Sequence, residues 1–346
     1  MIIPVENVGQ YGLVSDLPYD KIPLNAWTSG KNVRFRGGAV EKFFGYTEVC
    51  GNPLIPPKWL LHTSLTGNPL WPYAGDTAVG ATDGATHADV TRVGAAYSVL
   101  PGVNWTGGVL EGIAYINNGV DVPQMWNKPA LSQKLQDMTN WPAGVTARTL
   151  RTHKRYLVAL DVTKAGVRHS TMVKWSSQAP TGLPPASWDE TDETIDAGEY
   201  TLPSEEGGIL IDSVPLRDVH MLYRESQVWQ MRYVGIGAGD APIFAFTRLF
   251  EHIGVLSRDC VAEFFSGRHI IFTGDDIVLN EGQTARSIVS EKYRKAINID
   301  LTNYDKSFVA VDYNNTEVLT CFPEPGSAWP NKAIVWNWVT DTFGIR

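Results

Sequence analysis

The feature that most constrains the fold is a recurring unit in which a polar turn joins two apolar strands. The clearest copies cover residues 112–121, 154–161, 219–231, 261–272 and 307–319. They recur about every 45 residues, apart from one interval of about 65 that contains the polar stretch 176–208. A period of about 40 to 50 residues is typical of four-stranded propeller blades, which bury one another's faces when stacked. We therefore predict an all-β protein, a β-propeller of four-stranded blades with inserted loops.

Composition favours short strands and tight turns over long helices. The chain of 346 residues holds 12 Trp, 13 Tyr and 12 Phe, whereas 32 Gly and 21 Pro interrupt it about once every seven residues. We expect the Trp side chains to serve blade packing more than sugar stacking. Because the repeats share a pattern more than identities, a β-sandwich or two unrelated all-β domains stay open as alternatives.

Both ends of the sequence read as hairpins. Residues 32–46 alternate on either side of Gly37-Gly38, and residues 333–346 read as a strand, a turn at Thr340-Asp341 and the start of a return strand. Either the first hairpin completes the last blade and closes the propeller, or a further C-terminal segment follows. The expected division is an N-terminal segment with its hairpin over residues 1–50. The propeller then follows over 51–346, with an insertion around 176–208.

Net charge and cysteine content indicate which partners the protein can bind and in which compartment it folds. The net charge of −8, from 37 acidic and 29 basic residues, disfavours tight DNA binding but suits a pore through which DNA slides. Three widely spaced cysteines, Cys50, Cys260 and Cys321, are expected to be reduced in a cytoplasm. We expect no signal peptide, because the first residues lack a basic region followed by an apolar run, and no membrane span, because no apolar stretch approaches 18 residues.

No motif predicts catalysis, a metal or a cofactor, and we expect none of the three. The seven histidines are scattered, and nucleophile-elbow, Walker-type and sialidase repeat motifs are missing from the sequence. The run 235–240 (GIGAGD) departs from a dinucleotide fingerprint and is interpreted as a loop between blades. Asp275-Asp276, between two apolar runs, is interpreted as a hairpin turn instead of an acid–base pair.

An acidic cluster is the one candidate interface that the sequence indicates. It comprises Asp189, Glu190, Asp192 and Glu193, and it lacks the glycine-centred alternation of a calcium loop. A solvated loop is the plain interpretation. Because the cluster lies in the longest interval between repeats, we also consider it a candidate contact with a neighbouring subunit or partner protein.

Five short segments together resemble a known family. They are residues 32–38 (NVRFRGG), 118–126 (NGVDVPQMW), 174–177 (KWSS), 223–229 (YRESQVW) and 250–254 (FEHIG). The chain resembles, over most of residues 30 to 340, the tail nozzle or packaged-DNA stabilisation (tail accessory) proteins of short-tailed bacteriophages. Relatives of this kind tend to be longer than this chain.

This resemblance implies a structural virion protein and not an enzyme. Such a subunit assembles as a ring, expected to be a homo-hexamer, below the portal and adaptor proteins and beside tail fibres or tailspikes. It retains the packaged genome and conducts DNA through its lumen without sequence-specific binding, and it is synthesised in the host bacterial cytoplasm. The alternative is a glycan-binding or glycan-hydrolysing propeller. An intracellular scaffold propeller ranks third, because Trp-Asp and Gly-His signatures do not recur at the right places.

Overall fold

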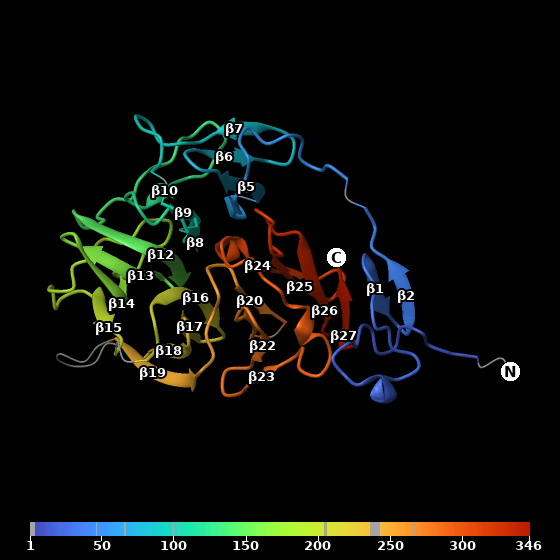
Figure 1. Cartoon of the computed structure of the whole chain (residues 1–346). Helices are drawn as coiled ribbons and strands as arrows, with labels where there is room; N and C mark the ends of the chain where they lie inside the picture. Colours follow the sequence, from blue (N-terminus) through green and yellow to red (C-terminus); the bar gives the residue numbers. More distant parts are fainter. Residues whose placement is uncertain are drawn as a thin grey trace. The chain divides into compact units, whose positions relative to one another are not determined.

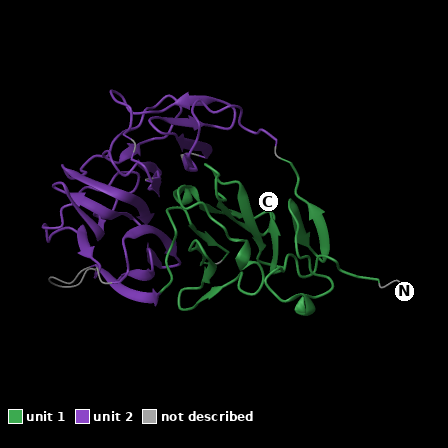
Figure 2. Ribbon diagram, in the orientation of Figure 1, with its two compact units in different colours: residues 1–46, 252–346 green, residues 47–251 purple. Residues whose placement is uncertain are grey.

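A computed structural model describes residues 4–45, 47–65, 67–98, 100–102, 104–203, 206–235, 243–265 and 267–346. The chain divides into two compact units, unit 1 with residues 1–46 and 252–346 and unit 2 with residues 47–251 (Figure 2). Strands and loops dominate both units (Figure 1). In the described ranges helix is confined to three short 3₁₀ turns, η1 (Tyr19–Lys21), η2 (Arg294–Ala296) and η3 (Tyr304–Lys306). None of the described helices has the length and apolar character that a membrane crossing requires.

Unit 2 is built from four antiparallel blades. The first contains β3 (Trp59–Leu60), β5 (Asn68–Ala74), β6 (Val79–Thr82) and β7 (His87–Asp89), with β4 (Thr63–Leu65) also paired to β5. The second contains β8 (Thr106–Leu110), β9 (Ile113–Asn117), β10 (Gln124–Trp126) and β11 (Gln136–Asp137). The third contains β12 (Val145–His153), β13 (Tyr156–Lys164), β14 (Val167–Trp175) and β15 (Gly198–Thr201). The fourth contains β16 (Leu210–Leu216), β17 (Val219–Arg224), β18 (Gln227–Tyr233) and β19 (Phe244–Glu251).

Unit 1 contains two sheets. One is a four-stranded blade of β20 (Val261–Phe264), β21 (Arg268–Phe272), β22 (Ile277–Asn280) and β23 (Ala285–Ser287). The other has six strands in the order β2, β1, β27, β26, β25, β24. Their bounds are β1 (Val33–Arg36), β2 (Ala39–Lys42), β24 (Phe308–Asp312), β25 (Glu317–Phe322), β26 (Lys332–Asn337) and β27 (Thr342–Ile345).

Within unit 2, hydrophobic clusters join each blade to the next. One cluster combines side chains of the first and second blades, another those of the second and third, and another those of the third and fourth. In the last of these, Trp175 on β14 meets Phe244 on β19 edge to face, with ring centroids 5.3 Å apart. All five residues of β9 are buried, because a blade between two neighbours has no face left for water.

The predicted fold class is confirmed: the chain is an all-β β-propeller of four-stranded blades with inserted loops. The repeated units at 112–121 and 154–161 each contain one strand, β9 and β13 respectively, instead of the two strands predicted. Those at 219–231, 261–272 and 307–319 each span two adjacent strands of one sheet. Apolar runs and turn residues were sufficient to locate them, because both signals act over a few residues.

The two predicted terminal hairpins are also confirmed, and they pair with each other. Gly37 and Gly38 have φ of 56° and 82°, the conformation that a tight turn between β1 and β2 requires. Val33 on β1 pairs with Ile345 on β27, so N-terminal strands extend the sheet that the last strands form. Buried Arg34 forms an ion pair of 3.3 Å with Glu317 of the same sheet. The expected division near residue 50 stays a prediction.

Candidate functional site

The predicted acidic cluster lies in the loop of residues 176–197 that joins β14 to β15. Asp189 and Asp192 each accept two hydrogen bonds, from the backbone N–H and the hydroxyl of Thr191 and Thr194 respectively, at 2.6–2.9 Å. These contacts repeat because the sequence repeats Asp-Glu-Thr in tandem. Asp189, Asp192 and Glu193 are exposed, so this part of the loop presents carboxylates to solvent in a defined shape.

Glu190, the fourth member of the cluster, points inward and belongs to a network of two lysines and two glutamates. Lys164 on β13 contacts Glu190 at 2.5 Å and Glu199 on β15 at 2.9 Å. Lys174 on β14 also contacts both glutamates, and its side chain is only 1% exposed. Burial acts to raise the pKa of Glu190, but the hydrogen bonds from Lys164 and Lys174 outweigh it and lower the pKa to about 2.

The same loop is anchored by aromatic packing. Trp188 is buried and meets Trp141 edge to face, with ring centroids 4.7 Å apart. Asn140 donates a hydrogen bond of 3.3 Å to the Pro185 carbonyl. Sequence reasoning missed Lys164 and Lys174 as partners of the cluster, although lysines among apolar strand residues were an available signal. The contact of Asp189, Glu190, Asp192 and Glu193 with a partner protein stays a prediction.

The variant Glu190→Gln is expected to destabilise the protein by about 1–3 kcal/mol at pH 7, because it removes a charged hydrogen-bond partner of buried Lys174. The folded-state pKa lies below the ordinary value of 4.5, so the stabilisation is present above pH 4.5 and is lost as pH falls toward 2. Urea unfolding of the wild type and variant across this range measures the difference. Glu193→Gln is the matched control, and a change within about 0.5 kcal/mol is expected there. Equal effects of the two variants would contradict the network's role.

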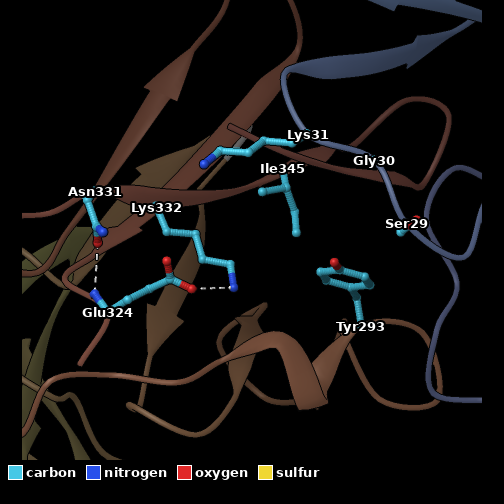
Figure 3. Close-up of a pocket in the computed structure, with 8 residues that line it drawn as sticks. All are labelled: Ser29, Gly30, Lys31, Tyr293, Glu324, Asn331, Lys332 and Ile345. Atoms are coloured by element: carbon cyan, nitrogen blue, oxygen red, sulfur yellow. Dashed lines mark hydrogen bonds and ion pairs between the residues drawn. The ribbon is translucent and has the colours of Figure 1, made fainter. Parts of the chain in front are cut away.

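A separate pocket of about 410 Å³ lies in unit 1 (Figure 3). Its volume falls in the range of about 300–1,000 Å³ that ligand sites occupy. The lining residues are Ser29, Gly30, Lys31, Tyr293, Glu324, Asn331, Lys332 and Ile345. They come from the extended run before β1, the turn before η2, the loop between β25 and β26, the start of β26 and the end of β27. Sequence reasoning missed this pocket, because its parts are separated by hundreds of residues.

Some polar groups in the pocket already form hydrogen bonds within the protein, and others do not. Lys332 donates hydrogen bonds to Glu324 at 2.9 Å and to the Ala296 carbonyl at 3.0 Å. The Asn331 side-chain oxygen accepts a hydrogen bond of 2.8 Å from the Glu324 N–H, which leaves the amide NH₂ as a donor. In Figure 3 the Lys31 side chain reaches across the upper rim of the pocket, and the Tyr293 hydroxyl faces its interior.

Two of the five segments quoted from the sequence, residues 223–229 and 118–126, form hydrogen bonds within the fold. In residues 223–229, fully buried Arg224 donates to the carbonyls of Gly208 and Pro203 and to the side-chain oxygen of Gln227. A Cβ at Gly207 would lie 2.3 Å from the Arg224 Cζ, so glycine is needed for this approach. In residues 118–126, the Asn118 side-chain oxygen accepts hydrogen bonds from two backbone N–H groups and shapes the turn after β9.

Two further interpretations from the sequence meet different outcomes. Asp275-Asp276 is confirmed as a turn, because the Thr273 N–H donates to the Asp276 carbonyl at 3.1 Å between β21 and β22. Both carboxylates contact Arg294, at 2.9 and 3.5 Å. The predicted loop over residues 235–240 lies outside the described residues from residue 236 onward.

Among described residues, no group of three or more His, Cys, Asp or Glu has the geometry of a metal site, and the three cysteines are free thiols.

Comparison with known proteins gives no family assignment. The sequence matches no protein-family model and no curated protein. Among solved structures, the CNH domain of AfRom2 is similar at 11% identity and a TM-score of 0.48, over 87% of this chain and 88% of that one. The propeller domain of Myceliophteria thermophila Cps50 (Swd1) is 11% identical, with a TM-score of 0.45 over 75% and 78%. Hsv2 of Kluyvelomyces marxianus is 12% identical, with a TM-score of 0.37 over 67% of this chain and 56% of the Hsv2 chain.

Proposed function

We propose that this chain is a structural protein of a short-tailed bacteriophage tail, forming a nozzle ring below the portal and adaptor proteins. The ring would conduct DNA during ejection and retain the packaged genome before it. The observation that carries the proposal is the resemblance of five segments to nozzle proteins, together with what those segments do. Arg34, Asn118, Lys174 and Arg224 belong to these segments, and each forms a hydrogen bond with a residue of a turn or loop.

The charge balance supports the same role. Lys and Arg contacts to phosphate create affinity for DNA, and each contact also resists sliding. A chain with net charge −8 repels phosphate on average, which suits a conduit more than a DNA-binding protein. Ring assembly, expected to be hexameric, would place the same surface patches at every subunit contact. Tail fibres or tailspikes are further expected partners.

Electron microscopy of the purified protein mixed with adaptor protein tests the proposal. Rings or tail-like assemblies that depend on the adaptor are the expected result, because a nozzle subunit is proposed to bind the adaptor protein above it as well as its own copies. Mixing with an unrelated ring-forming protein is the control, and it should give no assemblies. Monodisperse single chains in every mixture, together with hydrolysis of host surface polysaccharide by the isolated chain, would reject the proposal in favour of a glycan-cleaving propeller.

A further inference from the structure

The pocket in unit 1 carries one positive charge that its own residues do not neutralise. Lys332 is paired with Glu324 at 2.9 Å, which leaves Lys31. Lys31 is exposed, and in the part of the chain that the structure describes its ammonium has no ion pair or hydrogen bond. The Lys31 ammonium, the Asn331 amide and the Tyr293 hydroxyl all belong to the lining of one pocket. All three groups can donate hydrogen bonds, and one carries a positive charge, so together they suit an anion.

Tyr293 is the second observation that points to a ligand. Its side chain is only 8% exposed, and its hydroxyl, directed into the pocket, has no partner among the described residues. The ring is buried while the hydroxyl is open to the pocket, so the hydroxyl can donate a hydrogen bond to a group that binds there. Burial, with the Asp16 carboxylate nearby, raises the pKa of Tyr293. The hydroxyl therefore stays protonated at neutral pH and can donate to a carboxylate.

The charges of the pocket favour a carboxylate at the donor groups. Glu324 and Lys332 are paired with each other, so Lys31 supplies the charge that attracts an anion. Tyr293 and Ile345 supply apolar surface beside the donors. A carboxylate on a short aliphatic stem, the side chain of Asp or Glu, matches both the charge and the surface.

The protein itself carries carboxylates of this kind in its acidic loop. Asp189, Asp192 and Glu193 are exposed, and no described lysine or arginine forms an ion pair with them. Hydrogen bonds from Thr191 and Thr194 hold the two aspartates in place, which lowers the ordering entropy lost on binding. The remaining oxygen of each aspartate is left for an outside donor.

We propose that the lysine-lined pocket of one copy binds the acidic loop of a second copy through Lys31, Tyr293 and Asn331. This inference rests on the proposed ring, since pocket and loop are different surfaces and their pairing is head-to-tail. A head-to-tail contact closes into a ring when its rotation allows closure. The pocket and the loop are then two halves of one subunit interface.

A peptide of residues 187–195 (SWDETDETI) tests the pocket independently of ring assembly. Calorimetric titration of the full chain with this peptide should show binding that weakens with salt. Lys31→Ala and Tyr293→Phe should each weaken it about tenfold, by loss of a charge-assisted hydrogen bond. The matched control peptide, SWNQTNQTI, carries amides in place of the carboxylates, and Lys21→Ala is the matched control on the protein. Equal binding of the two peptides, or no binding of either, would overturn the inference.

A charge swap tests the interface in the assembled protein. Lys31→Glu and the double variant Asp192→Lys/Glu193→Lys should each fail to form rings, because like charges then meet at every interface. An equimolar mixture of the two should form rings again, since each pocket then meets a loop of opposite charge. Lys21→Glu should assemble like the wild type, and equal melting temperatures would show that all variants fold.

The two proposals fail in distinguishable ways. Wild-type rings that persist in Lys31→Glu, or a mixture that does not recover, would reject the pocket–loop contact and leave the nozzle function standing. Absence of adaptor-dependent rings in the wild type would reject the nozzle function. The peptide titration would still decide whether the pocket recognises the acidic loop.

Discussion

Replacing Arg151 by alanine is expected to destabilise the protein by about 3–5 kcal/mol, because it removes the guanidinium that holds a buried carboxylate. Arg151 on β12 forms two parallel hydrogen bonds, of 2.7 and 2.8 Å, with Asp212 on β16. The Asp212 side chain is completely buried. This pair joins the third and fourth blades of unit 2, so its loss should show as a lower urea midpoint of unfolding.

The exposed pair Arg248–Glu251 provides the matched control. Its atoms are 2.8 Å apart, but the side chains are 47% and 52% exposed, so Arg248→Ala should change stability by less than about 1 kcal/mol. The double variant Arg151→Met/Asp212→Leu should recover most of the stability lost in Arg151→Ala, since no uncompensated charge then remains buried. A loss in Arg151→Ala as small as that in Arg248→Ala would contradict the account.

Acid should weaken the same pair of blades through His153. This residue, at the end of β12, is buried, and neither ring nitrogen has a hydrogen-bond partner. It packs against His220 on β17, with ring centroids 4.6 Å apart, and against Phe244 on β19. Burial, with a smaller contribution from the positive charge of Lys154, lowers the pKa of His153 to about 4 from an ordinary 6.5.

The pH range of this effect follows from the direction of the shift. Between pH 6.5 and 4 the unfolded chain binds a proton at His153 and the folded chain does not, so stability falls as pH falls through this range. The full loss is about 3 kcal/mol. Thermal unfolding from pH 7.5 to 4 should show it in the wild type, and the variant His153→Phe should lack this part of the slope.

A histidine on the surface separates this effect from general acid destabilisation. His252→Gln changes an exposed side chain and should leave the wild-type slope in place. His153→Phe should also fold at pH 7 with stability close to the wild type, because an apolar ring replaces one whose nitrogens have no partner. An unchanged slope in His153→Phe would show that the buried ring does not control the acid response.

Much of the architecture was predictable from the sequence because its signals are local. Apolar runs located the strands of the repeated units, and Gly37-Gly38 and Asp275-Asp276 marked turns that the structure contains. The tandem Asp-Glu-Thr of the acidic loop is local too, and it shapes that loop by contacts two residues apart. Strand period and turn chemistry act between neighbours, so they can be read in order along the chain.

The candidate sites could be predicted only in part from such local signals. The acidic cluster was visible in the sequence, but the inward turn of Glu190 toward Lys164 and Lys174 was not. The pocket around Lys31 and Tyr293 had no sequence signal, because its lining comes from two segments, 1–46 and 252–346, that are far apart in the sequence. A lysine is recognisable in a sequence, but whether a carboxylate neutralises it depends on packing.

The sequence by itself determined that this protein is a chain of short antiparallel strands repeating as blades, with turns at stated residues. Tertiary structure alone decided which charges are buried and which partners they have. Arg151 and Asp212 are 61 residues apart, and Arg34 and Asn315 are 281 apart. The physical reason is that an ion pair forms where packing brings two side chains together and removes water, and no local pattern records which distant strands will do so.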